Sequence, residues 1–414
     1  MKRTARDNRE RQPKPVQRVE VSEKHIKFRV IALIVAIVVA VTAIGFGVYS
    51  ALKKDKGMTA ITVTATLRNC GDEFLFYYNV GYGKTSATAE YRALTSIYSQ
   101  LCVDAYRIFD EYEVYDDIVS VDYINSHPNE RITVNETLYN AFSKMLECAG
   151  RYIYYSMVYD YYSSIFYADS DLEASNFDPY LSDEIEDYYK EICAYADSAE
   201  NINLSLYDDY SVELCVSEQF LKFADESASR KFLSFSWFKN AFIIDYLADE
   251  LIKRGYTDGY ITSYDGYTRT LSERNMNLKI YDRDESYIYD VCNLSMDVGS
   301  IVVLRNFPVG LPRNYYYLYE NGDIRTRYID KFGLSLNNNT TFASYAKANC
   351  SDILMAIYLI WASPSVDNDK VVSLTADGIN SVYVKDRTVY YTEDNLKIDN
   401  LLSDERITYK KALL

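Results

Sequence analysis

The segment from Val30 to Leu52 constrains this chain more than any other feature, because its 23 residues include no charged side chain. At about 1.5 Å of rise per residue, a helix of this length crosses the roughly 30 Å hydrocarbon core of a bilayer. Residues 1–29 before it contain ten Lys and Arg against four acidic residues. Because basic residues gather on the cytoplasmic side of membrane spans, the sequence predicts a single-pass protein of the cell membrane. Its N-terminus is expected in the cytoplasm and its main domain outside the cell.

A cleaved signal peptide is the alternative for this segment. The apolar region of a signal peptide usually has about 7–15 residues and ends in small residues around a cleavage site. Segment 30–52 is longer, follows a 29-residue basic region and shows no A-x-A pattern. We therefore expect a retained anchor (30–52) between a basic tail (1–29) and a juxtamembrane linker (53–60). A main domain (61–395) and a C-terminal tail (396–414) are expected to follow.

Charge separates the two sides of the anchor. Residues 1–56 carry 13 basic and 5 acidic groups, whereas the rest of the chain carries 31 basic and 55 acidic groups, a net charge of −24. A domain this acidic repels nucleic acid and anionic lipid, so no nucleic-acid partner is expected. Its seven cysteines stand singly without a C-x-x-C pair, which argues against a zinc ribbon or a thioredoxin-type motif. We interpret them as small, buried free thiols.

Tyrosine dominates the aromatic residues, with 43 copies against 2 Trp and 2 His. A tyrosine can pack its ring in a core and keep its hydroxyl at the wet edge. We interpret the excess as amphipathic core and surface residues; a surface for stacking sugars or flavins is the alternative.

Apolar periodicity predicts strands and helices mixed in one continuous run. We expect strands at 74–81, 212–216, 259–263, 277–281 and 300–304, and helices at 86–112, 137–149, 152–167, 183–196, 241–254 and 351–362. Asn321-Gly322 predicts a hairpin between 315–320 and 325–329, and a second hairpin is expected at 381–392. Thr133 is the expected N-cap of the helix at 137–149. Mixed elements of this kind indicate an α/β or α+β fold.

Two motifs suggest enzyme chemistry but are incomplete. Gly81-Tyr82-Gly83-Lys84-Thr85 follows a strand and precedes a helix, as a phosphate-binding loop would, but the first glycine of that pattern is replaced by Tyr78. The loop is also expected outside the cell, where ATP is scarce. His127 is the single histidine beyond the anchor and stands in a loop without a serine elbow, so a nucleophilic triad is not expected.

The order of segments over roughly residues 60–395 resembles the ApbE-type family, the FAD:protein FMN transferases. The landmarks appear in family order: Asn69–Asp72, Tyr123–Asn125 with Ile132–Val134, Ala149–Tyr152, Phe235–Asp245, Ile261–Gly266, Tyr328–Asp330 and Ala348–Asp352. The resemblance implies a mixed α/β domain of T-fold type with FAD and Mg²⁺ as cofactors. It also implies a secreted or membrane flavoprotein as the partner that receives FMN.

The same resemblance assigns site residues. It places FAD-binding residues at Lys239, Asp245, Asp265, Gly266 and Asp330. It places a metal ligand at Asp352, since oxygen ligands suit Mg²⁺. It identifies no catalytic residue.

Several positions depart from the family pattern. In the family, an Asp and a Thr of the last helix hold the metal together with a backbone carbonyl, but the Thr position here is Ala356. The glycines before Lys239 are replaced by residues 235–238 (Phe-Ser-Trp-Phe), so the backbone can no longer approach a dinucleotide closely. The family's histidine before Asp330 is absent, and Arg327 stands nearby instead.

Three functions therefore stay open. The first is a membrane-anchored, extracytoplasmic enzyme that transfers FMN from FAD to a protein Thr or Ser with Mg²⁺. The second is a catalytically inactive relative that serves as a flavin-binding or protein-interaction module at the cell surface. The third is an unrelated surface domain whose elements have the same order.

Overall fold

The computed structural model describes residues 54–284, 287–310, 313–336 and 340–414. The chain divides into two compact units, Met1–Lys54 and Asp55–Leu414. The anchor predicted at 30–52 lies outside the described residues. Among the helices that the structure describes, none is long and apolar enough to cross a membrane.

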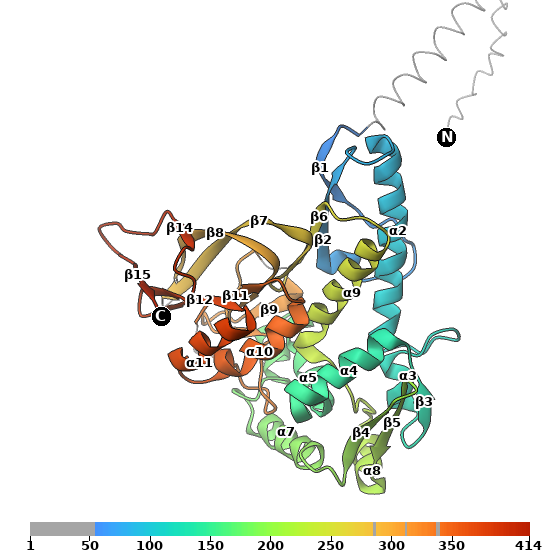
Figure 1. Cartoon of the computed structure of the whole chain (residues 1–414). Coiled ribbons are helices and arrows are strands. Elements are labelled where there is room, and N and C mark those ends of the chain that lie inside the picture. Colours follow the sequence, from blue (N-terminus) through green and yellow to red (C-terminus); the bar gives the residue numbers. More distant parts are fainter. Residues whose placement is uncertain (1–53, 285–286, 311–312, 337–339) are drawn as a thin grey trace, which may run out of the picture. The chain divides into compact units, whose positions relative to one another are not determined.

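A ten-stranded sheet forms the centre of the second unit (Figure 1). In spatial order its strands are β1 (Gly57–Ile61), β2 (Phe74–Val80), β6 (Gly259–Ser263), β7 (Tyr267–Asp284), β8 (Tyr287–Leu304), β11 (Phe342–Ala346), β12 (Asn380–Lys385), β13 (Thr388–Tyr391) and β15 (Lys410–Leu413), and β14 (Lys397–Asp399) pairs with β8 off this path. Neighbouring strands are antiparallel, except that β13 and β15 pair in parallel.

Three helices pack side by side on one face of this sheet: α2 (Ala87–Ile108), α9 (Lys239–Lys253) and α10 (Cys350–Ala362). The end of β8 is buried on both faces, which explains why residues 301–304 form a continuous apolar run. Val302 and Leu304 belong to the core beneath the helices, whereas Ile301 and Val303 belong to a second core on the opposite face. Successive side chains of a strand point to opposite faces, and both faces are covered here.

The second core is covered by the C-terminal segment. Leu396, Ile407 and Tyr409 are buried against strands β7, β8, β12 and β13. Residues 396–414, predicted as a tail, therefore supply β14 and β15 to the sheet. At the other end, residues 57–60 of the predicted linker belong to the edge strand β1.

The remaining elements form the lower part of the unit in Figure 1. They comprise a second sheet of β3 (Arg131–Thr133), β5 (Ser211–Val216) and β4 (Ile202–Tyr207), the helices α3 (Val121–Ser126), α4 (Glu136–Cys148), α5 (Ser156–Ser163), α6 (Asp171–Ser175), α7 (Asp183–Ala196) and α8 (Glu218–Glu226), and the 3₁₀ turns η2 (Gly150–Tyr154), η3 (Ser164–Tyr167) and η4 (Ser236–Phe238). Elsewhere lie η1 (Gly71–Glu73), η5 (Arg313–Tyr315), η6 (Leu374–Asp377), α11 (Asn368–Ser373) and the small hairpin β9 (Tyr316–Leu318) and β10 (Ile324–Thr326). One hydrophobic core joins the helices of this part to those on the large sheet.

The predicted α/β mixture is confirmed, and most of the expected elements are present. The acidic helix 183–196 and the strand 259–263 are found with the expected bounds, and segment 152–167 is α5 between two 3₁₀ turns. The N-cap prediction at Thr133 was wrong: Asn135 caps α4, and its side chain accepts a hydrogen bond from Leu138 N at 2.8 Å. Thr133 instead ends strand β3.

Tyrosine and acidic residues are used together in this fold. Tyrosine hydroxyls donate to carboxylates in at least nine pairs, including Tyr315 to Glu73, Tyr319 to Asp178, Tyr345 to Glu393 and Tyr409 to Asp282. Hydrogen bonds of this kind let an acid-rich domain place carboxylates at the edge of its core.

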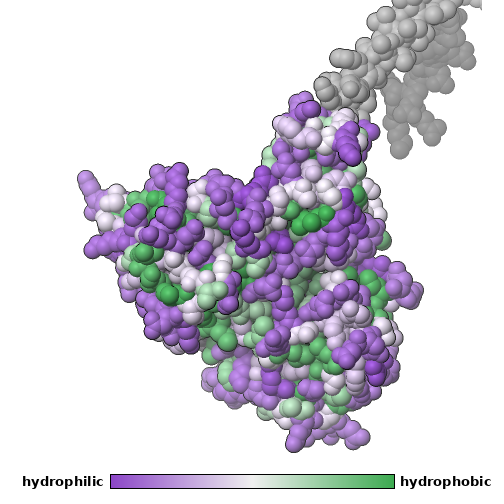
Figure 2. All heavy atoms as spheres, viewed as in Figure 1, coloured by the Kyte–Doolittle hydropathy of each residue, from purple (hydrophilic) through white to green (hydrophobic). Residues whose placement is uncertain are grey.

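Figure 2 shows hydrophilic residues over most of the visible face, with small hydrophobic areas between them. All seven cysteines are free thiols, as expected, and Cys148 is the one whose side chain is exposed.

Candidate functional site

The start of α9 forms one wall of a cavity of about 240 Å³, here called the central cavity. Its other walls come from η1, the end of α2 with the loop that follows, and the segment around η3. Arg327 closes it from the chain after β10. The charged residues at its wall are Glu73, Asp110, Glu111, Lys239 and Arg327, and tyrosine and phenylalanine rings supply much of the remainder.

The charged groups of the central cavity act on one another. Burial lowers the pKa of Lys239, but the carboxylates of Glu111 and Glu73 outweigh burial and raise it overall. Burial opposes ionisation of Glu73, but Arg327 and Lys239 outweigh it and lower the pKa of Glu73. Glu111 is more deeply buried, and this burial raises its pKa. At neutral pH the cavity therefore holds two cations beside a charged Glu73.

Asp265 lies next to this charged cluster. Asn240 Nδ2 donates to Glu73 Oε2 at 2.7 Å and to Asp265 Oδ2 at 2.9 Å, and thereby joins the two carboxylates. Burial raises the pKa of Asp265 to about 6. The fold thus brings the predicted residues Lys239 and Asp265 to the same region. Gly266, the next residue, is pressed against the backbone of β8 instead.

Asp245 is engaged at the start of α10. Its Oδ1 and Oδ2 accept hydrogen bonds from Cys350 N and Ser351 N, both at 2.8 Å. These amides lack partners within their own helix, so the carboxylate satisfies two of them and complements the helix dipole. Burial raises the pKa of Asp245 to about 6. The residue lines a groove of about 320 Å³ between α4 and α9, but both of its oxygens are occupied by the protein.

Asp330 serves a turn. Its Oδ1 accepts from Phe332 N at 2.8 Å and from Leu334 N at 3.0 Å, and the turn includes Gly333 at φ +75°. Burial raises the pKa of this carboxyl group. Its oxygen is directed at the chain's own amides.

Asp352 forms an ion pair with Lys144 of α4. Lys144 Nζ lies 2.5 Å from Asp352 Oδ1 and donates to Ser351 Oγ at 3.0 Å. Ala356 lies one turn further along α10, and Lys144, Asp352 and Ala356 line the same surface hollow. An ammonium group therefore stands beside the carboxylate that the family pattern assigns to the metal.

These residues do not fit Mg²⁺. Mg²⁺ requires near-octahedral oxygen coordination, usually with one or two carboxylates and substrate phosphates. Here one carboxylate remains, its oxygen is hydrogen-bonded to an ammonium, and the second side-chain ligand is a methyl group. Within the described ranges there is also no group of three or more His, Cys, Asp or Glu arranged to hold a metal ion.

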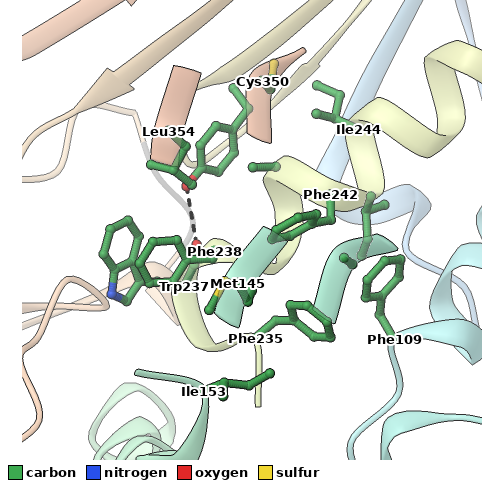
Figure 3. Close-up of a cluster of buried hydrophobic side chains, with 14 of the residues drawn as sticks. Phe109, Met145, Ile153, Phe235, Trp237, Phe238, Phe242, Ile244, Cys350 and Leu354 are labelled. Atoms are coloured by element: carbon green, nitrogen blue, oxygen red, sulfur yellow. Dashed lines mark hydrogen bonds between the residues drawn. The ribbon is translucent and has the colours of Figure 1, made fainter. Parts of the chain in front are cut away.

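Aromatic side chains fill the space before Lys239. Figure 3 shows Trp237 and Phe238 lying one against the other and Phe235 next to Phe109 and Met145. The rings of Trp237 and Phe238 are stacked at 3.8 Å, and Phe238 meets Tyr358 of α10 at 5.3 Å. This cluster lies where the family pattern has small residues. The backbone is therefore shielded from a ligand as large as FAD.

The phosphate-loop interpretation of 81–85 fails on its geometry. Gly81 N donates to Glu90 Oε2 at 2.6 Å, and a Cβ added at Gly83 would lie 2.8 Å from Glu90 Oε1. The chain's own carboxylate occupies the place of a phosphate. His127 stacks on Tyr123 at 4.2 Å, and its Nδ1 lies 2.8 Å from Tyr123 O, so it is a structural residue.

Four residues of this region were not predicted from the sequence to belong to a site. They are Glu73, Glu111, Lys144 and Ser236, the last of which was considered only as the replacement of a glycine. Glu111 accepts from Ser234 Oγ at 2.9 Å and from Phe235 N at 3.1 Å. These partners lie more than a hundred residues away in sequence, and no local pattern marks such a contact. Ser236 carried one signal, since it is the one polar residue in an aromatic run.

Comparison with solved structures identifies the fold. The ApbE protein of Thermotoga maritima superposes with a TM-score of 0.53 at 11% sequence identity, over 80% of this chain and 94% of that one. The flavin transferase ApbE of Vibrio cholerae gives 0.49 at 13% identity over 83% and 97% of the two chains, and the flavinyl transferase ApbE of Pseudomonas stutzeri gives 0.46 at 12% over 82% and 93%. Sequence comparison finds no matching family model and no matching curated protein. The chain thus has a divergent ApbE-like fold.

Proposed function

We propose that this chain is a membrane-anchored protein of flavin-transferase fold that binds a ligand outside the cell and no longer transfers FMN. The observation that carries this proposal is the ion pair between Lys144 and Asp352, with Ala356 beside it. A metal that entered here would meet a positive charge and a methyl group. Since Mg²⁺ would neutralise the FAD pyrophosphate during transfer, its loss removes the chemistry and leaves a binding domain.

The aromatic cluster supports the same conclusion. Transfer from FAD requires a cleft that holds a dinucleotide along the backbone before Lys239. Phe235 and Phe238 are completely buried there and Trp237 nearly so. The central cavity of about 240 Å³ remains, and it suits a much smaller ligand.

The location belongs to the proposal too. The uncharged segment 30–52, the basic residues before it and the net charge of −24 after it support a signal anchor with the domain outside the cell. FAD, Mg²⁺ and a flavoprotein partner belong to the alternative, in which the transferase is active.

The first test measures transfer chemistry with the full chain in detergent. FAD, Mg²⁺ and an acceptor flavoprotein with a free Thr or Ser hydroxyl are added, and AMP, which leaves FAD when FMN is transferred to that hydroxyl, is quantified by chromatography. We expect no AMP above a protein-free control and no effect of EDTA. Mg²⁺-dependent AMP that disappears in Asp352→Ala would overturn the proposal and establish the transferase.

The second test restores the metal ligands. We expect wild-type protein to leave Mn²⁺ free in solution, and the double variant Lys144→Ala/Ala356→Thr to bind it at least tenfold more tightly, as measured by electron paramagnetic resonance. The control is Lys222→Ala/Ala356→Thr, in which an exposed lysine of α8 is removed instead. Equal Mn²⁺ binding by wild type and double variant would show that Lys144 does not exclude a metal.

A further inference from the structure

Two cationic side chains, Lys239 and Arg327, line the central cavity without accepting groups of the described residues bound to them. Neither the Lys239 ammonium nor the Arg327 guanidinium forms a hydrogen bond or ion pair with another residue in the described ranges, although the Arg327 guanidinium lies over the ring of Tyr315 at 4.0 Å. Both side chains line the cavity. The charge of Arg327 also disfavours the charge of Lys239, so the two cations are within electrostatic range of each other.

The neighbouring carboxylates are already occupied by other donors. Glu73 Oε2 accepts from Asn240 Nδ2 at 2.7 Å and from Tyr315 OH at 3.0 Å. Glu111 accepts from Ser234 Oγ and Phe235 N. The carboxylates therefore balance charge across the cavity, but they leave the hydrogen-bonding capacity of Lys239 and Arg327 unused. Both side chains are partly exposed at the cavity wall, so an acceptor that enters the cavity from outside the chain can reach them.

Ser236 adds a third polar group at the same wall. It is 7% exposed, and its Oγ has no hydrogen-bond partner among the described residues. Its backbone has φ +53°, a conformation that is strained for a residue other than glycine. The hydrogen bond from Ser236 N to Ser234 Oγ at 2.8 Å helps to hold it there. A strained serine with an unused hydroxyl, one turn before Lys239, is an arrangement typical of a ligand site.

The charge and size of the cavity select the class of ligand. Three carboxyl groups, Glu73, Asp110 and Glu111, share the wall with Lys239 and Arg327. Burial raises the pKa of Glu111 and so favours its neutral form, which would leave two cations beside Glu73 and Asp110. A ligand with one negative charge therefore adds less repulsion here than a phosphate dianion. A volume of about 240 Å³ corresponds to about eight waters at roughly 30 Å³ each, far less than a dinucleotide needs. The rings of Tyr106, Phe109 and Phe166 offer apolar contact.

We propose that the central cavity binds a small organic acid whose carboxylate contacts Lys239, Arg327 and Ser236 and whose apolar part packs against the aromatic wall. This inference rests on the proposed function, because it names the ligand class of the binding domain. It differs from FAD binding in the size of the ligand and in needing no metal.

The two tryptophans of the chain report on this site. Trp237 follows Ser236 directly, and its ring lies 6.4 Å from that of Trp361. The experiment titrates the full chain in detergent with sodium benzoate and follows tryptophan emission and the melting temperature. Benzamide, which has the same shape without the charge, and inorganic phosphate serve as comparison probes. We expect saturable binding of benzoate, with benzamide and phosphate at least tenfold weaker.

Matched variants assign the binding to the three residues. Lys239→Met and Arg327→Met should each weaken benzoate binding at least tenfold, whereas Lys222→Met and Arg230→Met on the surface should leave it unchanged. Ser236→Ala removes a hydroxyl that has no partner in the fold, so it should fold normally and still weaken benzoate severalfold. This variant keeps the test decisive if either methionine variant fails to fold.

The inference is wrong if benzoate gives no saturable signal, if benzamide or phosphate binds as tightly, or if Ser236→Ala binds benzoate as wild type does. These outcomes are independent of the AMP assay. AMP formation would overturn the proposed function whatever benzoate does, whereas absence of benzoate binding alone would leave the loss of transfer in place and remove the carboxylate site.

Discussion

Gly266 shows how a residue assigned to a cofactor by resemblance can have a structural reason. It adopts φ +102°, and a Cβ atom built on it would lie 2.3 Å from the carbonyl oxygen of Val303. Val303 N in turn donates to Gly266 O at 2.9 Å. The two backbones meet where β7 begins and pairs with the end of β8, so glycine is required by the sheet itself.

Gly266→Ala should therefore destabilise the domain by more than about 3 kcal/mol, since the new methyl group must displace the backbone of β8. The matched control is Gly378→Ala, at φ +73° with open space around it, which should cost only about 1 kcal/mol from backbone strain. Urea denaturation of residues 55–414 measures both. Equal losses for the two variants would mean that the contact with Val303 contributes nothing.

At the scale of elements, α9 and α10 are joined by a single carboxylate. Asp245, in the middle of α9, caps the first amides of α10, and Arg269 Nε of β7 lies 3.9 Å from Asp245 Oδ1. The side chain is 6% exposed, and burial raises its pKa to about 6. The carboxyl group of Asp245 therefore links α9 to α10 and β7, and it also lines the groove between α4 and α9.

The raised pKa of Asp245 predicts a pH dependence of stability. Between about pH 4 and pH 6 the folded domain retains a proton that the unfolded chain has lost, so stability falls as the pH rises through this window. A shift of about two pKa units corresponds to about 3 kcal/mol. Asp245→Asn does not titrate, so its unfolding free energy relative to wild type should rise by up to that amount between pH 4 and pH 7. Urea denaturation at several pH values checks this; parallel curves for the two proteins would contradict it.

At the scale of the whole molecule, basic and acidic residues are unevenly distributed along the chain. The proposed anchor has basic residues before it and an acidic domain after it, and this difference in charge predicts which side of a membrane each would occupy. The domain also offers one exposed thiol for measuring that orientation, Cys148 at the end of α4. Burial of part of this side chain, and then Glu147, raise its pKa, so labelling is best done at mildly alkaline pH.

We expect a membrane-impermeant maleimide to label Cys148 in intact cells that express the full chain. Cys148→Ser should remove most of the signal, because five of the other cysteines are buried. A cysteine introduced in the basic tail by Ser22→Cys, in the Cys148→Ser background, is the control and should react only after the cells are permeabilised. The opposite pattern, with Ser22→Cys labelled in intact cells, would reverse the predicted orientation.

The sequence by itself determined the local elements and the mixed fold class. Helix α7, strand β6 and the turn at Asn321-Gly322 follow from periodicity, caps and turn residues, which act between close neighbours in the chain. The order of these elements along the chain was also sufficient to predict the ApbE-like fold. The full lengths of β7 and β8 were not predicted, although the two strands pair with each other from Tyr267 and Val302 to Asp284 and Tyr287. Charged residues such as those at 282–284 interrupt the alternation of apolar residues that would indicate a strand.

The tertiary structure alone decided what the candidate site contains. Lys144 reaches Asp352 across 208 residues of sequence, and Asp245 caps α10 across 105. Contacts between residues so far apart leave no periodic signal, since each depends on how whole elements pack. For the same physical reason the sequence could show that Ala356 replaces a metal ligand, but only the fold could show that an ammonium group stands beside Asp352.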